Sequence, residues 1–396
     1  MSLINFDQAL VIIADTAAPL AAERIALADA GRRVLAEPVR ASFDSPRNAV
    51  STMDGYAVSN SDAHAGASLT LIGVSAAGAR FAGSVAPGEA VRIFTGATLP
   101  DGADRVVIQE VVTAVDDIIV IGEAGTDRFV RAAASDFAAG EVVVAAGSRL
   151  TPGALLAAAA AAGTDLLAVT RRPRVMTIAT GDELCAAGQT LGPDQIPDSI
   201  GPGLGAMIAT LGGLWVGHAL LADDLPALEA AAQQAVAIAD LVVVIGGASV
   251  GARDHAKAMF APLGMDLLFS KVAIKPGKPV WLGRVGATLV MGLPGNPGSA
   301  LVTARLLLAP LMSGLLGQAT PPPLQWIDLP LAAPIPATGM RETFLRAALV
   351  EGKLLPVANQ DSGAQRALGE ASWLIRCAAG QGPLTAATLV PALALQ

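Results

Sequence analysis

The chain is poor in cysteine, in aromatic residues and in positive charge. Its 396 residues include 2 cysteines and 4% aromatic residues, and the formal net charge is −8 at pH 7. Cys185 and Cys377 lie far apart and have no metal-ligand spacing, so they indicate a reducing compartment rather than a disulfide framework or a zinc site. The acidic balance argues against a nucleic-acid partner and against an anionic membrane surface.

Long uninterrupted apolar runs are also missing. The nearest approach to a membrane span, residues 150–169, is mostly alanine and is broken by proline, glycine and aspartate. Residues 301–316 contain Arg305 and Pro310. Both segments are interpreted as core helices, so no membrane partner is expected. The first residues carry Asp7 and no basic region, which is unlike a signal peptide, and the expected localisation is cytoplasmic.

Lysine is scarce, and it is concentrated in one stretch. Four of the five lysines lie within residues 242–299, together with the loops GGASVG (246–251), KPGKP (275–279) and GLPGNP (292–297). Glycine allows backbone N–H groups to converge on an anion, and a strand–loop–helix unit points a helix N-terminus at it. This stretch therefore predicts an anion-binding site. The alternative is a turn-rich surface with solvated lysines.

The pattern changes along the chain predict a multidomain α/β plus β protein. Residues 171–318 alternate strand and helix periods, which predicts a doubly wound, mostly parallel sheet covered on both faces. Residues 41–139 carry short strand-like runs between turns and predict a β insertion domain. Residues 1–40 and 140–170 are expected to pack together as a discontinuous scaffold domain, and residues 319–396 form a small C-terminal β domain.

Local sequence patterns predict three helices in particular places. A helix should begin at about Asn5, and a second, short helix should end at Leu35. A third helix should run from about Asp254 to Phe260, after the GGASVG loop.

Polar residues follow the predicted parallel strands. The segment TGDEL (180–184) comes directly after one strand, and Asp223 follows another. Ligands on parallel sheets bind beyond the carboxyl ends of the strands, so these side chains are candidates for nucleotide or metal binding. An aspartate pair at this place also suits a helix N-cap at Asp224.

The motifs GGASVG-x-x-D, AIKPGKP and GLPGNP-x-SA, in this order, resemble the MoeA / gephyrin E-domain family. Members of that family insert molybdenum into molybdopterin. TMDGYAV (52–58) resembles the family segment S-A-M-D-G-Y-A, and FTGA (94–97) resembles its T-G-A segment. GMRETFLR (339–346) resembles G-R-x-E-F-x-R, and Ser362-Gly363 partly resembles a glycine–serine loop. The resemblance covers nearly the whole chain and implies a central domain of the molybdopterin-binding type.

The resemblance implies the site residues. Six are implied to be catalytic: Asp54, Asp136, Glu183, Asp254, Lys275 and Lys278. Fourteen more are implied to bind the substrate: Thr95, Gly181, Asp182, Asp198, Ser199, Gly246, Gly247, Ser249, Gly251, Lys257, Pro294, Gly295, Asn296 and Arg341. Mg²⁺ would be held by Asp54, Glu183 and Asp254, because this ion binds through a few carboxylates and substrate phosphates.

The resemblance also implies the reaction and the assembly. Adenylylated molybdopterin and molybdate would give molybdenum cofactor and AMP. The site would be completed in a homodimer, with the β insertion of one subunit facing the α/β domain of the other. Other cofactor-biosynthesis proteins and molybdoenzyme chaperones are further candidate partners.

Three departures from the family pattern leave an alternative open. Ala134-Ser135 stands where the family has Gly-Glu, Ile200 replaces an asparagine, and His255 replaces a tyrosine. The chain would then be a divergent paralogue that binds molybdopterin, or an assembly factor, without full transferase activity. His64 and His218 have no metal-ligand spacing and are interpreted as structural.

Overall fold

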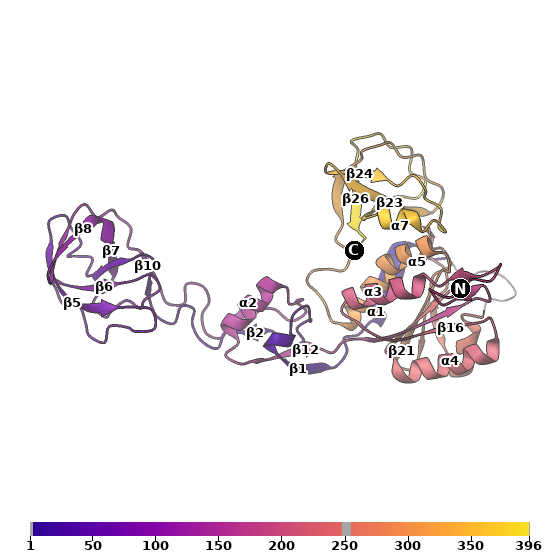
Figure 1. The fold of residues 1–396 in the computed structure, drawn as a ribbon, viewed down its shortest axis with the longest axis horizontal. Helices are drawn as coiled ribbons and strands as arrows, with labels where there is room; N and C mark the ends of the chain where they lie inside the picture. The colour runs from indigo at the N-terminus through magenta and orange to yellow at the C-terminus, as the bar shows by residue number, and fades with distance from the viewer. Residues whose placement is uncertain (1–2, 248–254, 396) are drawn as a thin grey trace.

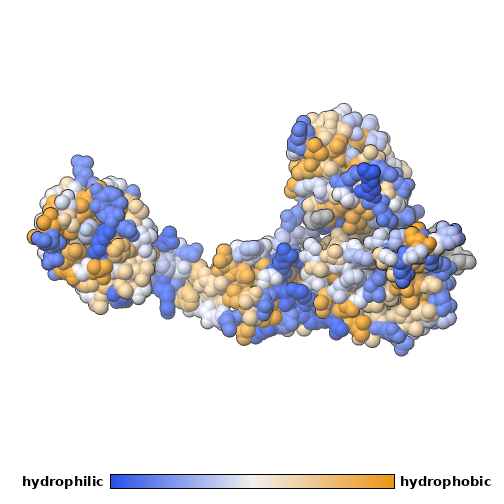
Figure 2. Space-filling model, viewed as in Figure 1, coloured by the Kyte–Doolittle hydropathy of each residue, from blue (hydrophilic) through white to orange (hydrophobic). Residues whose placement is uncertain are grey.

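The computed structural model describes residues 3–247 and 255–395. The molecule is elongated and bent, with the β insertion at one end and the central α/β domain at the other (Figure 1). A small scaffold lies between them, and the C-terminal β domain stands on the central domain (Figure 1). The space-filling view shows an open concave side between the β insertion and the C-terminal domain (Figure 2).

The central sheet has six strands in the order β16-β13-β17-β21-β20-β18. Its members are β16 (Leu214–Leu221), β13 (Arg174–Thr180), β17 (Leu241–Ile245), β21 (Thr288–Leu293), β20 (Trp281–Val285) and β18 (Asp266–Phe269). The first four strands are parallel, and the last two are antiparallel to their neighbours. The expected mostly parallel α/β sheet is therefore confirmed.

Helices cover both faces of this sheet. One face carries α1 (Phe6–Thr16), α3 (Ile200–Thr210) and a continuous helix formed by α5 (Pro297–Thr303), the π-helical η4 (Ala304–Leu308) and α6 (Ala309–Leu315). The other face carries α4 (Leu225–Ile238) and the 3₁₀ helix η3 (Ala258–Leu263). Because both faces are covered, all five residues of β17 are buried apolar side chains.

The helix Pro297–Leu315 is long and apolar enough to span a membrane by length and composition alone. However, 78% of its most apolar window is buried inside the protein. It packs against the sheet as the central core helix, which explains its composition.

The N-terminal helix begins where the sequence places it. Asn5 and Gln8 form a reciprocal capping box, which satisfies two otherwise unpaired N–H groups. Phe6, Ala9 and Ile13 are buried in the core of the central domain. By packing, α1 therefore belongs with the α/β domain rather than with the scaffold.

The scaffold is formed by two separate stretches of chain. Strand β1 (Ala22–Ala26) pairs with β12 (Leu166–Thr170), and β2 (Val39–Arg40) pairs with β11 (Val142–Val144). Helix α2 (Pro152–Ala161) covers them. The prediction of a short helix that ends at Leu35 is wrong. Only the 3₁₀ turn η1 (Leu27–Asp29) forms, because the following backbone instead makes β-bridges to residues 149 and 169.

The helix expected over residues 254–260 is also corrected in its described part. Residues 258–263 form the 3₁₀ helix η3, which contains Pro262 and ends at Gly264 with φ 67°. Proline lacks an N–H group, and residues 258–263 adopt the shorter 3₁₀ form rather than an α-helix. Asp254 lies outside the described residues.

The β insertion contains a six-stranded sheet in the order β7-β4-β6-β5-β9-β8. Its strands are β7 (Arg105–Ile108), β4 (Gly55–Val58), β6 (Glu89–Ile93), β5 (Ser68–Ser75), β9 (Ile118–Ile121) and β8 (Val112–Val115). Between this sheet and the scaffold, β3 (Val50–Ser51) pairs with β10 (Val130–Arg131). The 3₁₀ turn η2 (Gln109–Val111) joins β7 to β8.

The C-terminal sheet includes one strand, β19, from the part of the sequence that precedes the C-terminal domain. Its order is β19-β23-β25-β26-β22, with β24 paired to β23. The strands are β19 (Ile274–Lys275), β23 (Glu342–Val350), β25 (Trp373–Cys377), β26 (Leu389–Ala394), β22 (Ile327–Pro330) and β24 (Lys353–Pro356), and α7 spans Arg366–Glu370. The parallel β19–β23 pair ties the KPGKP segment to the C-terminal domain, and the sequence did not predict it.

Candidate active site

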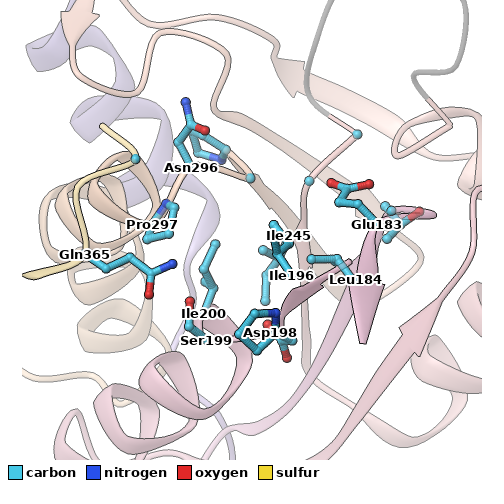
Figure 3. Close-up of a pocket in the computed structure, with 18 of the residues that line it drawn as sticks. Glu183, Leu184, Ile196, Asp198, Ser199, Ile200, Ile245, Asn296, Pro297 and Gln365 are labelled. Atoms are coloured by element: carbon cyan, nitrogen blue, oxygen red, sulfur yellow. The ribbon is translucent and has the colours of Figure 1, made fainter. Parts of the chain in front are cut away.

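A cavity of about 820 Å³ opens at the carboxyl ends of β13, β17 and β21. Figure 3 shows Glu183 and Leu184 on one wall, Asn296, Pro297 and Gln365 on the opposite wall, and Asp198 and Ser199 between them. Nine of the predicted residues line it: Gly181, Glu183, Asp198, Ser199, Gly246, Gly247, Pro294, Gly295 and Asn296. Four separate segments of the sequence thus meet at the sheet edge where such folds bind ligands.

Glycine backbones form part of the wall where β17 ends. Gly246 adopts φ 90°, and a Cβ on it would lie 2.7 Å from the carbonyl oxygen of Thr180. A Cβ on Gly295 would lie 3.3 Å from the Cα of Gly246. The loops after β17 and β21 therefore approach each other as bare backbone, which only glycine permits at position 246.

The loops after β13 and β16 are joined by their polar groups. The Thr180 hydroxyl donates to the Asp223 carboxylate, and the backbone N–H of Asp223 donates to Asp182 Oδ1 over 3.0 Å. Asp223 lines the cavity, whereas Asp182 supports this loop from outside the lining. Asp224 accepts from the N–H of Ala227 over 3.2 Å, which confirms the N-cap alternative for that residue.

Asp198 is the buried carboxylate of the cavity, with 6% of its surface exposed. It follows the short strand β15 (Ile196–Pro197), which pairs with β14 (Leu184–Cys185) beside the TGDEL loop. Its Oδ1 accepts from the N–H of Gly201 over 3.0 Å, and its Oδ2 lies 2.7 Å from His218 Nε2. Sequence reasoning missed His218 because 20 residues separate it from its partner.

The loop after β21 is held in place by the C-terminal domain. Asn296 stands at the N-terminus of α5, and its Nδ2 donates to Ser362 Oγ over 2.9 Å. The N–H of Gly298 donates to the Ser362 carbonyl over 2.7 Å. Gly363 and Gln365 also line the cavity. The only sequence signal for this contribution was the partial glycine–serine resemblance at Ser362-Gly363.

The four predicted cations, Lys257, Lys275, Lys278 and Arg341, do not line this cavity. Lys275 and Lys278 are exposed on the KPGKP turn, whose Pro279 lines the cavity. Arg341 donates from Nη1 to the carbonyl of Ile274 over 3.1 Å, so it holds the turn in place. The Lys257 ammonium lies 6.0 Å from the centre of the Trp281 ring. Ser249, Gly251 and Asp254 lie outside the described residues.

Asp54 and Thr95 meet in the β insertion. Asp54 Oδ1 accepts from the backbone N–H of Thr95 over 2.7 Å and from its hydroxyl over 2.8 Å. These two hydrogen bonds, with a smaller contribution from Arg92, lower the pKa of Asp54. The β insertion lies at the far end of the molecule from the cavity (Figure 1), so one chain does not bring Asp54 beside Glu183.

Asp136 lies at the junction between the β insertion and the scaffold. It is exposed, and its N–H donates to the carbonyl of Ser45 over 2.9 Å. Ala134, two residues earlier, adopts φ 57°. This is the left-handed region, where the family pattern has glycine and this chain has alanine.

The donor set suits a magnesium ion that a substrate completes. Among residues 3–247 and 255–395 no group of three or more His, Cys, Asp or Glu side chains forms a metal-binding cluster. Glu183 and Asp223 nevertheless present carboxylates to the cavity. Mg²⁺ commonly binds through one or two carboxylates, waters and substrate phosphates, so these residues fit the ion without a full protein cage.

Comparison with known proteins agrees with this geometry. The family model described as MoeA N-terminal region (domain I and II) matches residues 4–163, and the probable molybdopterin binding domain matches residues 176–314. The molybdopterin molybdenumtransferase of Synechococcus elongatus is 34% identical over 94% of both chains. The Haemophilus influenzae protein of the same name is 37% identical over 76% of this chain and 74% of its own. The chain belongs to the molybdopterin molybdenumtransferase family.

The MoeA fold is equally clear. The crystal structure of a molybdopterin biosynthesis MoeA protein from Pyrococcus horikoshii superposes with a TM-score of 0.84, and each chain is covered in full at 28% identity. Both the family resemblance and the expected architecture are therefore confirmed.

Proposed function

We propose that the chain inserts molybdenum into adenylylated molybdopterin, giving molybdenum cofactor and AMP. The main support for this proposal is the composition of the cavity wall. The cavity joins a glycine backbone wall, the N-terminus of the helix Pro297–Leu315 and the Glu183 carboxylate of the TGDEL segment at one sheet edge. The names of the relatives favour this reaction over other uses of such a site.

The chain's own residues would act mainly by electrostatics. N–H groups of the glycine loops would bind phosphate or molybdate oxygens, and the positive end of the dipole of the helix Pro297–Leu315 would favour the same anions. Lys275 and Lys278 would neutralise the pyrophosphate as charge develops on its leaving oxygen. Glu183, with Asp223, would hold Mg²⁺, which supplies a Lewis acid for the phosphoanhydride. The remaining carboxylates would order water for its cleavage.

A second copy of the chain would complete this site. Asp54, Thr95 and Asp136 belong to the β insertion or its junction, remote from the cavity of the same chain (Figure 1). The open concave side offers space for another molecule (Figure 2). We therefore propose a homodimer in which Asp54 and Thr95 face the partner's cavity.

The runner-up is a paralogue that binds molybdopterin without full turnover. Ile200 lines the cavity where the family has an amide, and Ala134 occupies a left-handed position. These departures support the alternative, whereas retention of Glu183 and of both KPGKP lysines supports the transferase.

A single-turnover experiment separates the two functions. The chain would be mixed with adenylylated molybdopterin, Mg²⁺ and molybdate, and AMP release and molybdenum in the pterin would be followed together. Glu183→Gln should lower the rate about 100-fold or more, because it removes a carboxylate ligand of the Mg²⁺ that would stabilise charge on the reacting phosphates. Glu229→Gln, in α4 and outside the cavity lining, is the matched control. Tight pterin binding without AMP release by the unmodified chain would establish the binding paralogue instead.

A further inference from the structure

A line of hydrogen-bonded side chains runs from the sheet to the cavity wall. Trp215 Nε1 donates to Thr177 Oγ1 over 2.9 Å. Thr177 Oγ1 lies 2.8 Å from His218 Nδ1, and His218 Nε2 lies 2.7 Å from Asp198 Oδ2. Only the last residue of this line, Asp198, lines the cavity.

Two glycines of α3 make room for this line. A Cβ on Gly201 would lie 2.6 Å from His218 Nε2 and would overlap the Asp198 carboxylate. A Cβ on Gly205 would lie 2.5 Å from the Trp215 ring. Because residues four apart share a helix face, the pattern Gly-x-x-x-Gly fits the two rings of β16. The two glycines of α3 thus leave the space that the Trp215 and His218 rings and the Asp198 carboxylate occupy.

The direction of each hydrogen bond follows from the chemistry of the groups. The indole nitrogen of Trp215 can only donate, so Thr177 Oγ1 accepts there. An ionised carboxylate can only accept, so the proton between His218 and Asp198 lies on Nε2. The Thr177 hydroxyl proton then goes to His218 Nδ1, or to the carbonyl of Gly217 at 3.3 Å when both ring nitrogens carry protons. The imidazole orientation is therefore fixed from both sides.

This arrangement excludes other roles for His218. Both ring nitrogens are engaged, so neither is available as a metal ligand. The residue does not belong to the cavity lining, so it does not reach the reacting atoms. What it touches at the cavity is the Asp198 carboxylate, whose other oxygen is fixed by the N–H of Gly201.

We infer that His218 is the positioning residue for Asp198. It holds the carboxylate in one rotamer, so that the remaining lone pairs of the carboxylate face the cavity and accept from N–H or O–H groups of the bound pterin. The inference rests on the proposed function, since it names how the same cavity orders its buried acceptor. Outer partners that orient a binding side chain typically change affinity or activity about 10–100-fold when removed.

The test compares two amides of nearly equal chemistry at position 218. In His218→Gln the amide nitrogen reaches the place of Nε2 and keeps the donor for Asp198. In His218→Asn the shorter side chain reaches only the place of Nδ1, so it keeps Thr177 and loses Asp198. His64→Asn is the control, because His64 is exposed, its Nδ1 lies 3.3 Å from the carbonyl oxygen of Ala65, and it does not line the cavity.

The readout is the Kd for molybdopterin, measured by anaerobic calorimetry, alongside the single-turnover rate. His218→Asn should weaken binding about 10–100-fold, whereas His218→Gln should stay within about 3-fold of the unmodified chain. In an Asp198→Asn background, His218→Asn should add no further loss, because the two residues act as one unit.

Equal affinities for the Gln and Asn variants would overturn the inference, as would additive losses in the Asp198→Asn background. Failure of the proposed function looks different: the unmodified chain would bind molybdopterin but release no AMP. A ¹⁵N spectrum of the ligand-free chain gives an independent check, since a His218 ring without a proton on Nε2 would also contradict the inference.

Discussion

At the residue scale, the contact between Asp54 and Thr95 supports a functional role for these two segments better than either sequence motif does alone. Each segment could be a simple hairpin turn, and 41 residues separate them. The structure joins them by two hydrogen bonds to one carboxylate oxygen, which keeps Asp54 ionised.

Thr95→Ala should raise the pKa of Asp54 toward, but not fully to, its ordinary value. The variant removes the hydroxyl donor but keeps the backbone N–H, which makes the larger contribution. Because the folded pKa lies below the unfolded one, the stabilisation is present at neutral pH and is lost as pH falls through the folded pKa. Carboxyl ¹³C titration measures the shift, and an unchanged pKa would contradict the assigned cause.

Ala134 carries strain that the family pattern avoids with glycine. Its φ of 57° costs an alanine about 1–2 kcal/mol, whereas glycine tolerates it. Ala134→Gly should therefore stabilise the chain by about 0.5–1 kcal/mol, after the entropy that glycine gains in the unfolded state is subtracted. Urea unfolding measures this, and Ala133→Gly should shift stability in the opposite direction. A destabilising Ala134→Gly would show that the position is not strained.

At the scale of elements, β17 and the glycines that follow it form the part of the site that sequence patterns predict best. The run LVVVI indicates a strand buried on both faces, and the glycines behind it indicate a backbone wall. Both features follow from local chemistry. The β19–β23 pairing does not, because two residues of a proline-rich turn carry no strand period of their own.

Gly246→Ala should destabilise the chain more than Gly188→Ala does. Both glycines adopt φ 90°, so both variants incur the same left-handed strain of about 1–2 kcal/mol. Only at position 246 would the new Cβ also meet a backbone oxygen, at 2.7 Å, whereas position 188 is open. Thermal unfolding and molybdopterin affinity measure the difference. Equal effects of the two substitutions would mean that the close approach to β13 is unimportant.

At the scale of the whole molecule, the sequence predicts the kinds of domain better than their contacts. Periodicity placed the central sheet and the β insertion, because each depends on local patterns. It did not place α1 on the central core, Ser362 against Asn296, or Gln365 at the cavity, because those contacts depend on tertiary packing. Likewise, the Asp198–His218 pair forms only when α3 and β16 come together.

The separation of the β insertion from the cavity means that mixing two variants can test whether one site is shared between two copies of the chain. Asp54→Ala and Glu183→Ala should each be inactive alone. If one site uses Asp54 of one copy and Glu183 of the other, a mixed dimer has one intact site and one doubly altered site. Random exchange makes half of the dimers mixed, so the mixture should recover about one quarter of the unmodified activity.

This mixing experiment, read out as AMP release in single turnover, is the most direct measurement. Its control mixes Glu183→Ala with Lys278→Ala, which alter the same domain and should leave every site defective. Recovery near one quarter in the first mixture alone is the predicted result. No recovery in that mixture, with subunit exchange verified by mass, would contradict a site shared between two copies.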